Sequence, residues 1–348
     1  VSDMTASPMK RLLSGMQPTG SGRLHLGNYE GALKPWIALQ GKYEMYCFIA
    51  DWHALTTMAG SPDSIADQSR EVALDYLSAG LDPNQVAIFR QSAVPQHAEL
   101  AVLLGMLTPV SWLERVPTYK EKREHVEHQE GGSDASVSFG LLGYPVLQAA
   151  DILLYRAHVV PVGKDQAAHL ELTREIARRF NHLYSTDVFP EPQALIQEMT
   201  GTLPGLDADA DGKLRKMSKS YGNCIYMTDS EDDVAARLKG AFTTPTKMRK
   251  TDPGIPEGCS VCLLRKLYDA DNYTTQWDEC RSGERGCVQS KRETTEIVNA
   301  MLEPIRERRK LYSSDPAELD RLLKDGADRA AAMAEATMQI VRETMKFI

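Results

Sequence analysis

The sequence lacks the features that would place the chain in a membrane or outside the cell. No apolar run approaches the ~20 residues that a membrane-spanning helix needs. Residues 1–9 contain no apolar signal core, which predicts a chain that is not secreted. Acidic residues outnumber lysine and arginine, and the net charge is −8. We therefore expect a cytoplasmic protein with no membrane contact. Nucleic acid would bind it only through local basic clusters, with residues 120–123, 247–250 and 306–310 as candidates unless they are solvated surface.

The length and the order of apolar segments predict an α/β protein. A single core rarely grows beyond ~250–300 residues, so a chain of 348 residues is expected to form two domains. Short runs rich in β-branched and aromatic residues alternate with helical patterns, which favours a doubly wound parallel sheet covered by helices. The strand candidates are Arg11–Met16, Glu44–Ala50, Val86–Gln91 and His158–Val162. After about residue 230 the pattern is mostly helical, and we place the boundary so that residues 1–215 and 216–348 form the two parts.

Polar residues directly follow three of the strand candidates. Gln17 follows the first, residues 51–53 follow the second, and residues 163–166 follow the fourth. Ligands of open α/β sheets bind beyond the carboxyl ends of the strands, so these residues are expected to lie close together. Residues 202–212 are rich in Gly, Pro and Asp and are predicted to form a loop.

The turn after the first strand carries the segment His25-Leu26-Gly27-Asn28. Glycine lets backbone approach a phosphate, and the helix that follows offers unpaired N–H groups at its N-terminus. His25 stands where the third glycine of a G-x-G-x-x-G fingerprint would be, which argues against a nicotinamide dehydrogenase. Taken alone, the segment is also compatible with a plain strand–turn–helix connection.

Nearly two hundred residues later the chain reads Lys216-Met217-Ser218-Lys219-Ser220. Two lysines three residues apart, among small hydroxyl residues, suit the charge of a polyphosphate leaving group. An exposed basic loop is the alternative for this segment alone. Together with residues 25–28, it indicates an enzyme that activates a carboxylate with ATP.

A third pattern lies in the apolar helix expected from Tyr144 to Tyr155, with proline in its first turn. Tyr144, Gln148 and Asp151 are spaced at i, i+4 and i+7 and therefore share one helix face. A buried carboxylate needs a hydrogen-bond donor, which a ligand with one N–H or O–H would supply. The alternative is a core aspartate that accepts from backbone or from an arginine.

These motifs together resemble the tryptophanyl-tRNA synthetases, a family of class I aminoacyl-tRNA synthetases. The resemblance is specific over residues 10–225 and looser towards the C-terminus. Its further segments are Ser14-Gly15-Met16-Gln17-Pro18-Thr19-Gly20, Leu113-Glu114-Arg115, Ala149-Ala150-Asp151-Ile152-Leu153-Leu154-Tyr155 and Val160-Pro161-Val162-Gly163-Lys164-Asp165-Gln166.

The resemblance implies a Rossmann-like catalytic domain, a helical anticodon-binding domain whose end can dock back on the first, and a homodimer. It implies that Mg·ATP and L-tryptophan form tryptophanyl-adenylate, which then acylates tRNA(Trp). Asp151 would accept the indole N–H, and rings without that donor would be rejected by ~10⁴–10⁵. The implied catalytic residues are Lys216, Lys219, Gln17, His25 and Asn28. The implied ATP site comprises Gln17, Pro18, Thr19, Gly27, Asn28, Gly163, Lys164, Asp165, Leu203, Lys216, Met217, Ser218, Lys219 and Ser220. The implied amino-acid site comprises Asp151, Tyr144, Gln148, Gln166, His53, Gly15, Leu13, Val160 and Val162.

The chain departs from the family pattern at three places. Ser21-Gly22 adds two residues before His25, Gln148 stands where the bacterial family has methionine, and Leu13 stands where phenylalanine is common. The amino-acid pocket is therefore expected to be less aromatic and more polar. A pocket relaxed towards substituted tryptophan, a tyrosine-specific relative, and a synthetase-like sensor are the alternatives to a tryptophan enzyme.

Four of the six cysteines fall in a short span, at Cys259, Cys262, Cys280 and Cys287. Some members of the family carry an iron–sulfur cluster in this region, and four thiolates also suit zinc. Ser290 stands at the position of the fourth cluster ligand. We therefore expect a vestigial site with free thiols rather than a bound cluster or zinc ion.

Overall fold

A computed structural model describes residues 9–58, 63–120, 138–163, 166–196 and 203–348. Its centre is a five-stranded parallel sheet in the order β3-β2-β1-β4-β5. The strands are β1 Arg11–Met16, β2 Glu44–Ile49, β3 Val86–Arg90, β4 Val159–Val162 and β5 Gln193–Ile196. The predicted α/β class and parallel sheet are confirmed, and the bounds of the first four strands agree with prediction to within one residue. β5 was not predicted.

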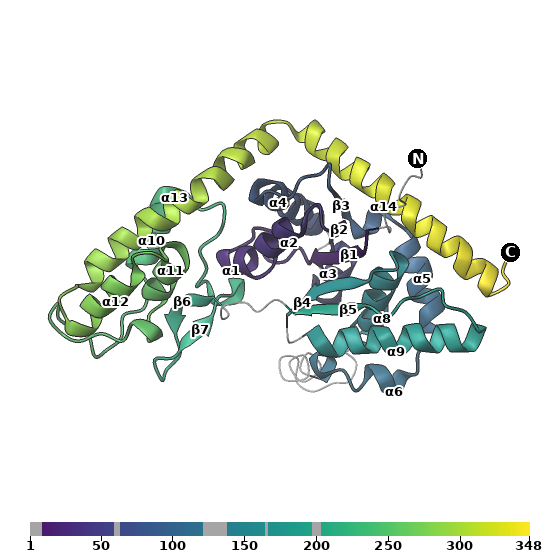
Figure 1. Cartoon of the computed structure of the whole chain (residues 1–348), viewed down its shortest axis with the longest axis horizontal. Helices are drawn as coiled ribbons and strands as arrows, with labels where there is room; N and C mark the ends of the chain where they lie inside the picture. Colours follow the sequence, from purple (N-terminus) through teal and green to yellow (C-terminus); the bar gives the residue numbers. More distant parts are fainter. Residues whose placement is uncertain (1–8, 59–62, 121–137, 164–165, 197–202) are drawn as a thin grey trace, which may run out of the picture.

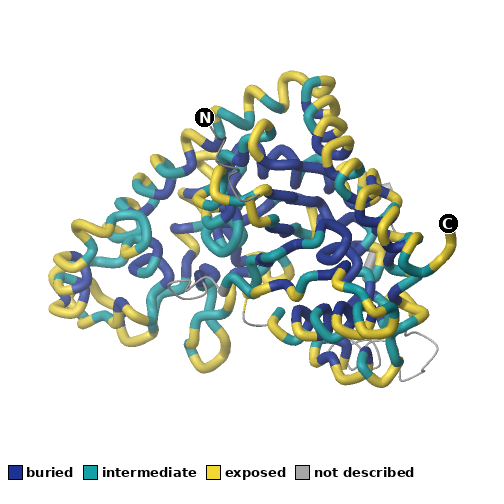
Figure 2. Tube along the Cα trace, turned by 45° about the vertical axis from the view of Figure 1, so that its right-hand side comes forward, coloured by how far each residue is buried: buried dark blue, intermediate teal, exposed yellow. Residues whose placement is uncertain are grey.

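Helices cover both faces of the sheet, as Figure 1 shows. Alternate residues of β2 supply the two cores: Tyr46 and Phe48 face one, and Met45, Cys47 and Ile49 face the other. Figure 2 shows buried residues concentrated in the strands and the inner sides of the helices. The helices of this part are α1 Leu26–Asn28, α2 Lys34–Leu39, α3 Asp51–Met58, α4 Asp63–Ala79, α5 Gln96–Gly105, α6 Val110–Leu113, α8 Phe139–Leu154 and α9 Ala167–Tyr184.

Helix α8 begins earlier than the sequence pattern predicted. Ser138 accepts a hydrogen bond from the Leu141 backbone N–H and so caps the helix N-terminus. Pro145 consequently lies inside the helix rather than in its first turn. The predicted face is unaffected, and Tyr144 and Asp151 are both buried.

The expected loop at residues 202–212 is instead part of a β-hairpin. Strands β6 Pro204–Ala208 and β7 Leu214–Lys216 pair antiparallel, and the hairpin ends at the predicted basic segment. Beyond it, helices α10 to α12 and the first half of α13 gather at one end of the molecule, while α14 returns along the sheet (Figure 1). These helices are α10 Glu231–Lys239, α11 Ser260–Tyr268, α12 Tyr273–Ser282, α13 Cys287–Ser314 and α14 Pro316–Thr344.

Helix α14 packs directly on strand β3. A Cβ on Gly326 would lie 2.0 Å from the Ile88 carbonyl oxygen, so only glycine permits this approach. Arg329 donates to the carbonyl oxygens of Pro83 and Val86 beside it. The C-terminal helix therefore closes the β3 edge of the sheet.

The basic cluster at residues 306–310 mostly serves internal contacts. Arg308 donates to the Ser78 carbonyl oxygen at 2.6 Å, and Arg309 pairs with the buried Asp75. Asp75 in turn accepts from the Leu24 backbone N–H at 2.6 Å, at the start of the 25–28 segment. The cluster thus connects α13 to α4 and to the turn after β1. Because Arg308 and Arg309 are used in these internal contacts, they are poor candidates for binding nucleic acid. None of the described helices is long and apolar enough to cross a membrane.

Candidate functional site

A cavity of ≈ 430 Å³ opens at the carboxyl ends of strands β1, β2 and β4. This is where an open α/β sheet is expected to bind its ligands. The structure brings many of the predicted residues together in its wall, namely Leu13, Gly15, Gln17, His53, Tyr144, Gln148, Asp151, Val160, Val162, Gly163 and Gln166. Lys164 and Asp165 lie outside the described residues.

The segment at residues 25–28 forms a capped helix start. The Asn28 backbone N–H donates to His25 Nδ1 at 3.3 Å, and the His25 backbone N–H donates to Asn28 Oδ1 at 3.1 Å. Burial and the positive charges of Lys219 and Lys216 lower the pKa of His25 to about 4. At neutral pH the ring is therefore uncharged. Because Nδ1 accepts a hydrogen bond, the ring proton lies on Nε2, where it can be donated to an anionic oxygen.

The two added residues before this segment form a turn that packs on α4. Gly22 has a φ of +77°, and a Cβ there would lie 2.5 Å from the Gln68 carbonyl oxygen. The Gly22 N–H donates to the Thr19 carbonyl oxygen at 3.0 Å. The insertion is thus absorbed against the helix, and the capped start at His25 is intact.

The lysine segment closes over the turn at residues 17–28. Lys219 Nζ donates to the Thr19 carbonyl oxygen at 2.9 Å. A Cβ on Gly27 would lie 3.6 Å from the Met217 Cβ, and Met217 is buried. The Met217 N–H donates to the Leu203 carbonyl oxygen at 3.4 Å. The two motifs, nearly two hundred residues apart in sequence, are neighbours in the structure.

The same two segments are also joined by backbone pairing. The Leu26 N–H donates to the Ile225 carbonyl oxygen, and the Met227 N–H donates to the Leu24 carbonyl oxygen, both at 2.9 Å. The stretch that follows the lysine segment is therefore anchored on the first motif. Pro18 lies in the turn after β1, and Ser218 and the exposed Ser220 lie in the lysine segment.

Asp151 is buried in the cavity wall with 1% of its surface exposed. Its Oδ1 accepts from Gln91 Nε2 at 2.8 Å and pairs with His97 Nδ1 at 2.6 Å, while its Oδ2 pairs with His53 Nε2 at 2.8 Å. Burial would raise the pKa of Asp151, but hydrogen bonds from His53 and His97 outweigh it, so the pKa lies below its ordinary value. The carboxylate is thus stabilised as an anion by three side chains rather than by backbone or an arginine.

A second polar group lines the cavity around Tyr144. The Tyr144 hydroxyl lies 2.7 Å from Thr118 Oγ1 and 3.0 Å from His169 Nε2, and Thr118 and His169 are themselves 3.0 Å apart. These contacts fix the Tyr144 hydroxyl at the cavity wall. Apolar side chains on either side include the predicted Leu13, Val160 and Val162.

Sequence reasoning missed Gln91, His97, Thr118 and His169. Gln91 directly follows strand β3, so the rule that selected Gln17 and residues 51–53 would also have selected it. His97 and His169 lie within helices α5 and α9 and carry no local signal. Only the packing of α5 and α9 on α8 brings them to the site.

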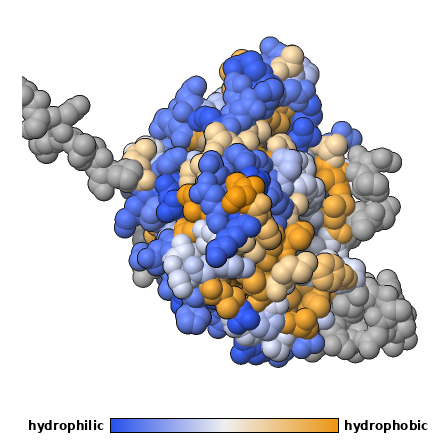
Figure 3. Space-filling model, turned by 90° about the vertical axis from the view of Figure 1, so that its right-hand side faces the viewer, coloured by the Kyte–Doolittle hydropathy of each residue, from blue (hydrophilic) through white to orange (hydrophobic). Residues whose placement is uncertain are grey.

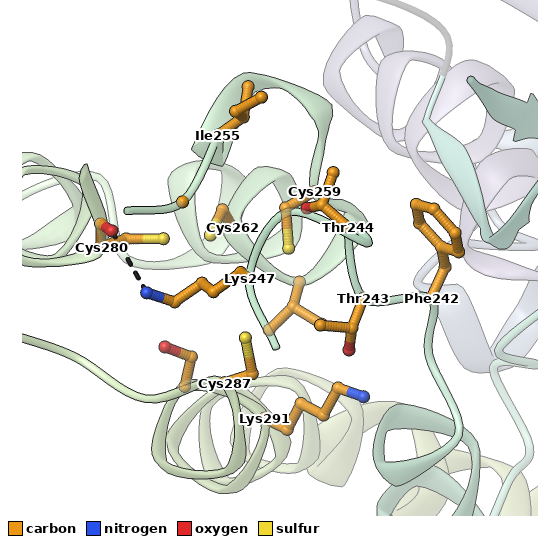
Figure 4. Close-up of a pocket in the computed structure, with 13 residues that line it drawn as sticks. Phe242, Thr243, Thr244, Lys247, Ile255, Cys259, Cys262, Cys280, Cys287 and Lys291 are labelled. Atoms are coloured by element: carbon orange, nitrogen blue, oxygen red, sulfur yellow. Dashed lines mark hydrogen bonds between the residues drawn. The ribbon is translucent and has the colours of Figure 1, made fainter. Parts of the chain in front are cut away.

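The four clustered cysteines line a separate cavity between α11, α12 and α13, shown in Figure 4 with the Lys247 and Lys291 side chains. A hydrogen bond from the Cys262 thiol is the main cause of a lowered pKa at Cys259 and at Cys280. Lys247 Nζ donates to the Cys280 carbonyl oxygen at 3.4 Å. Within the described ranges no three His, Cys, Asp or Glu side chains are arranged to hold a metal ion.

The chain is similar to proteins of known family. The family described as tRNA synthetases class I (W and Y) matches residues 7–303. The tryptophan–tRNA ligase of Thermotoga maritima is 42% identical, with 97% of this chain and 99% of the relative covered. That of Ralstonia nicotianae is 39% identical, with 97% and 98% covered. A crystal structure of tryptophanyl-tRNA synthetase from Campylobacter jejuni complexed with ADP and tryptophan superposes with a TM-score of 0.84 at 34% identity, covering 97% of this chain and 99% of that one.

Proposed function

The chain belongs to the class I tRNA synthetases for tryptophan and tyrosine, and we propose that it activates L-tryptophan with ATP and transfers it to tRNA(Trp). The proposed specificity for tryptophan depends mainly on the buried Asp151 carboxylate in the cavity wall. This anion lines a cavity whose walls include Leu13, Val160 and Val162, which suits a flat apolar ring with one polar hydrogen. Relatives at about 40% identity over nearly the whole chain are tryptophan–tRNA ligases, which favours tryptophan over tyrosine.

In the first step a tryptophan carboxylate oxygen attacks the α-phosphorus of ATP. The bond from that phosphorus to the bridging oxygen breaks, and pyrophosphate leaves with the electron pair. The protein supplies position and charge rather than a covalent intermediate. We propose that Lys216 and Lys219 stabilise the negative charge of the departing pyrophosphate. The His25 Nε2–H would donate to a phosphate oxygen, and Asn28 would hold the His25 ring.

Mg²⁺ enters as the Mg·ATP complex in this scheme. Mg²⁺ commonly binds through substrate phosphates and waters rather than through a dedicated protein cage.

In the second step the terminal ribose hydroxyl of tRNA(Trp) attacks the adenylate carbonyl, and AMP leaves. Around the amino acid we assign Tyr144 and Gln166 to the α-amino group, His53, Gly15 and Gln148 to the ring pocket, and Asp151 to the indole N–H. For ATP we assign Gln17 to Thr19, Gly27, Leu203, Gly163, Lys164 and Asp165, with Met217, Ser218 and Ser220 shaping the lysine segment.

ATP–pyrophosphate exchange tests this function, because it follows the reversible first step. We expect exchange that depends on tryptophan and is at least ~10²-fold slower with tyrosine at equal concentration, since the Asp151 site must place a bicyclic ring. Charging of tRNA(Trp) transcript then reports the second step. Exchange that is absent with tryptophan, or faster with tyrosine, contradicts the assignment.

We propose that the working form is a homodimer. Val102, Met106, Val110 and Phe139 are exposed by 58%, 78%, 55% and 87% on or beside α5, α6 and α8. These helices contact one another, and Figure 3, which views the side where they lie, shows hydrophobic surface gathered there. Exposed apolar patches of this kind commonly mark protein interfaces.

Met106→Glu is expected to convert the protein to monomers, since it places a like charge from each copy at an apolar contact. Light scattering should give twice the mass of one chain for the unaltered protein and a single-chain mass for the variant. Met248→Glu is the matched control, because Met248 is 82% exposed and lies on the segment before α11. Dimers that survive Met106→Glu and Met248→Glu equally well would place the interface elsewhere.

We further propose that residues 1–215 act as the catalytic domain and that residues 216–348 carry the lysine segment and the anticodon-binding helices. The cytoplasm is the proposed compartment. Six free cysteines agree with a reducing environment, in which disulfides are rare.

A further inference from the structure

We propose that Tyr155 and His97 are positioning residues that hold Asp151 with one acceptor position, on Oδ2, directed at the indole N–H of tryptophan. This inference rests on the proposed function and adds two residues that do not line the cavity. They form a chain that runs from the Tyr155 hydroxyl through the His97 ring to the Asp151 carboxylate.

The contacts that link Tyr155, His97 and Asp151 are short and buried. The Tyr155 hydroxyl lies 2.8 Å from His97 Nε2, and His97 Nδ1 lies 2.6 Å from Asp151 Oδ1. Tyr155 and His97 are both 0% exposed. Aromatic rings hold them in place: Tyr46 stacks on Tyr155 with ring centroids 4.5 Å apart, and Phe48 lies 5.9 Å from the His97 ring.

The direction of the hydrogen bonds follows from Asp151. An ionised carboxylate only accepts, so His97 Nδ1 carries a proton and donates it to Asp151 Oδ1. The lone pair of His97 Nε2 then accepts from the Tyr155 hydroxyl. Burial, followed by the charges of Asp151 and Tyr46, raises the pKa of Tyr155 well above its ordinary value, so the hydroxyl has a proton to donate.

The number of acceptor positions on Asp151 shows how many remain for the substrate. Each carboxylate oxygen has two lone pairs. Oδ1 uses both, for His97 and Gln91, and Oδ2 uses one, for His53. Among the contacts of the described residues, one position on Oδ2 is left, and we assign it to the substrate. Without the Tyr155 hydroxyl, His97 Nε2 loses its donor, so the ring is no longer fixed at both nitrogens and its Nδ1–H is held less firmly on Asp151 Oδ1. The carboxylate would lose its fixed orientation.

The test is Tyr155→Phe, which removes the hydroxyl and keeps the ring. The probes are tryptophan and β-(3-benzothienyl)alanine, in which sulfur replaces the indole N–H. We expect the KM for tryptophan in pyrophosphate exchange to rise about tenfold, as for loss of a hydrogen bond to a charged group, with kcat changed less than about threefold. The inhibition constant of benzothienylalanine against tryptophan should change less than about twofold, because it donates no hydrogen bond to Asp151.

Tyr76→Phe is the matched control. Tyr76 is also 0% exposed, and its hydroxyl donates to the Phe48 carbonyl oxygen at 3.3 Å, but it lies in the other core. It should leave both constants unchanged. Equal weakening of tryptophan and benzothienylalanine by Tyr155→Phe would show a merely structural role and overturn the proposal, as would no effect on either ligand.

A double variant separates the effect of the Tyr155 hydroxyl on His97 from a general loss of packing. His97→Asn offers a side-chain amide N–H at the Nδ1 position and has no second ring nitrogen for Tyr155 to hold. In this background Tyr155→Phe should alter the tryptophan KM less than about twofold, and a persistent tenfold effect would overturn the proposal. Absence of tryptophan-dependent exchange in the unaltered protein would instead reject the proposed function, so the two failures are distinguishable.

Discussion

Lys219→Ala is expected to lower kcat for tryptophan-dependent pyrophosphate exchange by about 10²–10³-fold, the range found when one preorganised donor to a developing charge is removed. Negative charge builds on the bridging oxygen as pyrophosphate departs, and the Lys219 ammonium is placed to meet it. The KM for tryptophan should change little, because Lys219 contacts the nucleotide loop rather than the amino-acid cavity.

The contact made by Lys219 is a reason to expect that it acts mainly in the transition state. Its Nζ donates to the Thr19 carbonyl oxygen at 2.9 Å. A phosphate oxygen of ATP would have to replace this carbonyl oxygen as the acceptor. Binding of ATP therefore exchanges one hydrogen bond for another, and the net gain comes when charge moves onto the leaving group.

Lys213→Ala provides the control for this prediction. Lys213 is an exposed lysine on the β6–β7 hairpin, six residues before Lys219, and its backbone N–H donates to Asp209 Oδ1 at 2.9 Å. Its loss should leave kcat within about twofold. If both alanine variants slow exchange equally, the effect is one of general positive charge, and the specific role of Lys219 is wrong.

The sheet was predictable because its strands carry their signal locally. β2 to β4 carry β-branched or aromatic residues, and β1 has the buried pair Leu12 and Leu13. Parallel strands buried on both faces show such apolar runs. β5, Gln193–Ile196, has one β-branched residue, whereas the equally short β4 has three valines, so β5 does not stand out. The hairpin β6–β7 was predicted as loop because Gly, Pro and Asp dominate its sequence. Its Gly212, with a φ of +77°, belongs to the turn, and the flanking residues pair.

The site was predictable wherever a residue follows a strand or shares a helix face with another candidate. Gln17, His53 and Gln166 were found by the first rule, and Tyr144, Gln148 and Asp151 by the second. Neither rule found His97, the partner of Asp151 on α5, because it reaches Asp151 only through the packing of α5 against α8. Long-range contacts of this kind leave no periodic trace in the sequence.

The partners found for Asp151 also change the expected degree of specificity. A carboxylate without internal donors would be left bare by a ring that lacks N–H, and rejection of ~10⁴–10⁵ would follow. Here three side chains already bond to the carboxylate. Benzothienylalanine therefore leaves one acceptor position unused, which costs about 1.5–3 kcal/mol. We expect discrimination of about 10–10²-fold between tryptophan and this analogue.

Asp151→Asn should lower kcat/KM for tryptophan by about 10²–10³-fold and bring the ratio of tryptophan to benzothienylalanine close to one. The amide has a single acceptor oxygen, and its NH₂ group opposes fewer donors when it faces His53 than when it faces Gln91 and His97. In that orientation Gln91 and His97 take both acceptor positions of the oxygen, and none is left for the indole N–H. Pyrophosphate exchange with tryptophan and inhibition by the analogue give both quantities.

Loss of a buried charge can also lower the stability of the fold, so the prediction needs a control variant at a second buried aspartate. Asp229 is 1% exposed and pairs with Arg23 and Arg237, outside the amino-acid cavity. Asp229→Asn leaves the indole contact in place, so whatever it does to stability should affect both ligands alike and preserve their ratio. An Asp151→Asn enzyme that still prefers tryptophan as strongly as the unaltered protein would mean that the ring pocket selects by shape, and that the carboxylate serves only to order His53, Gln91 and His97.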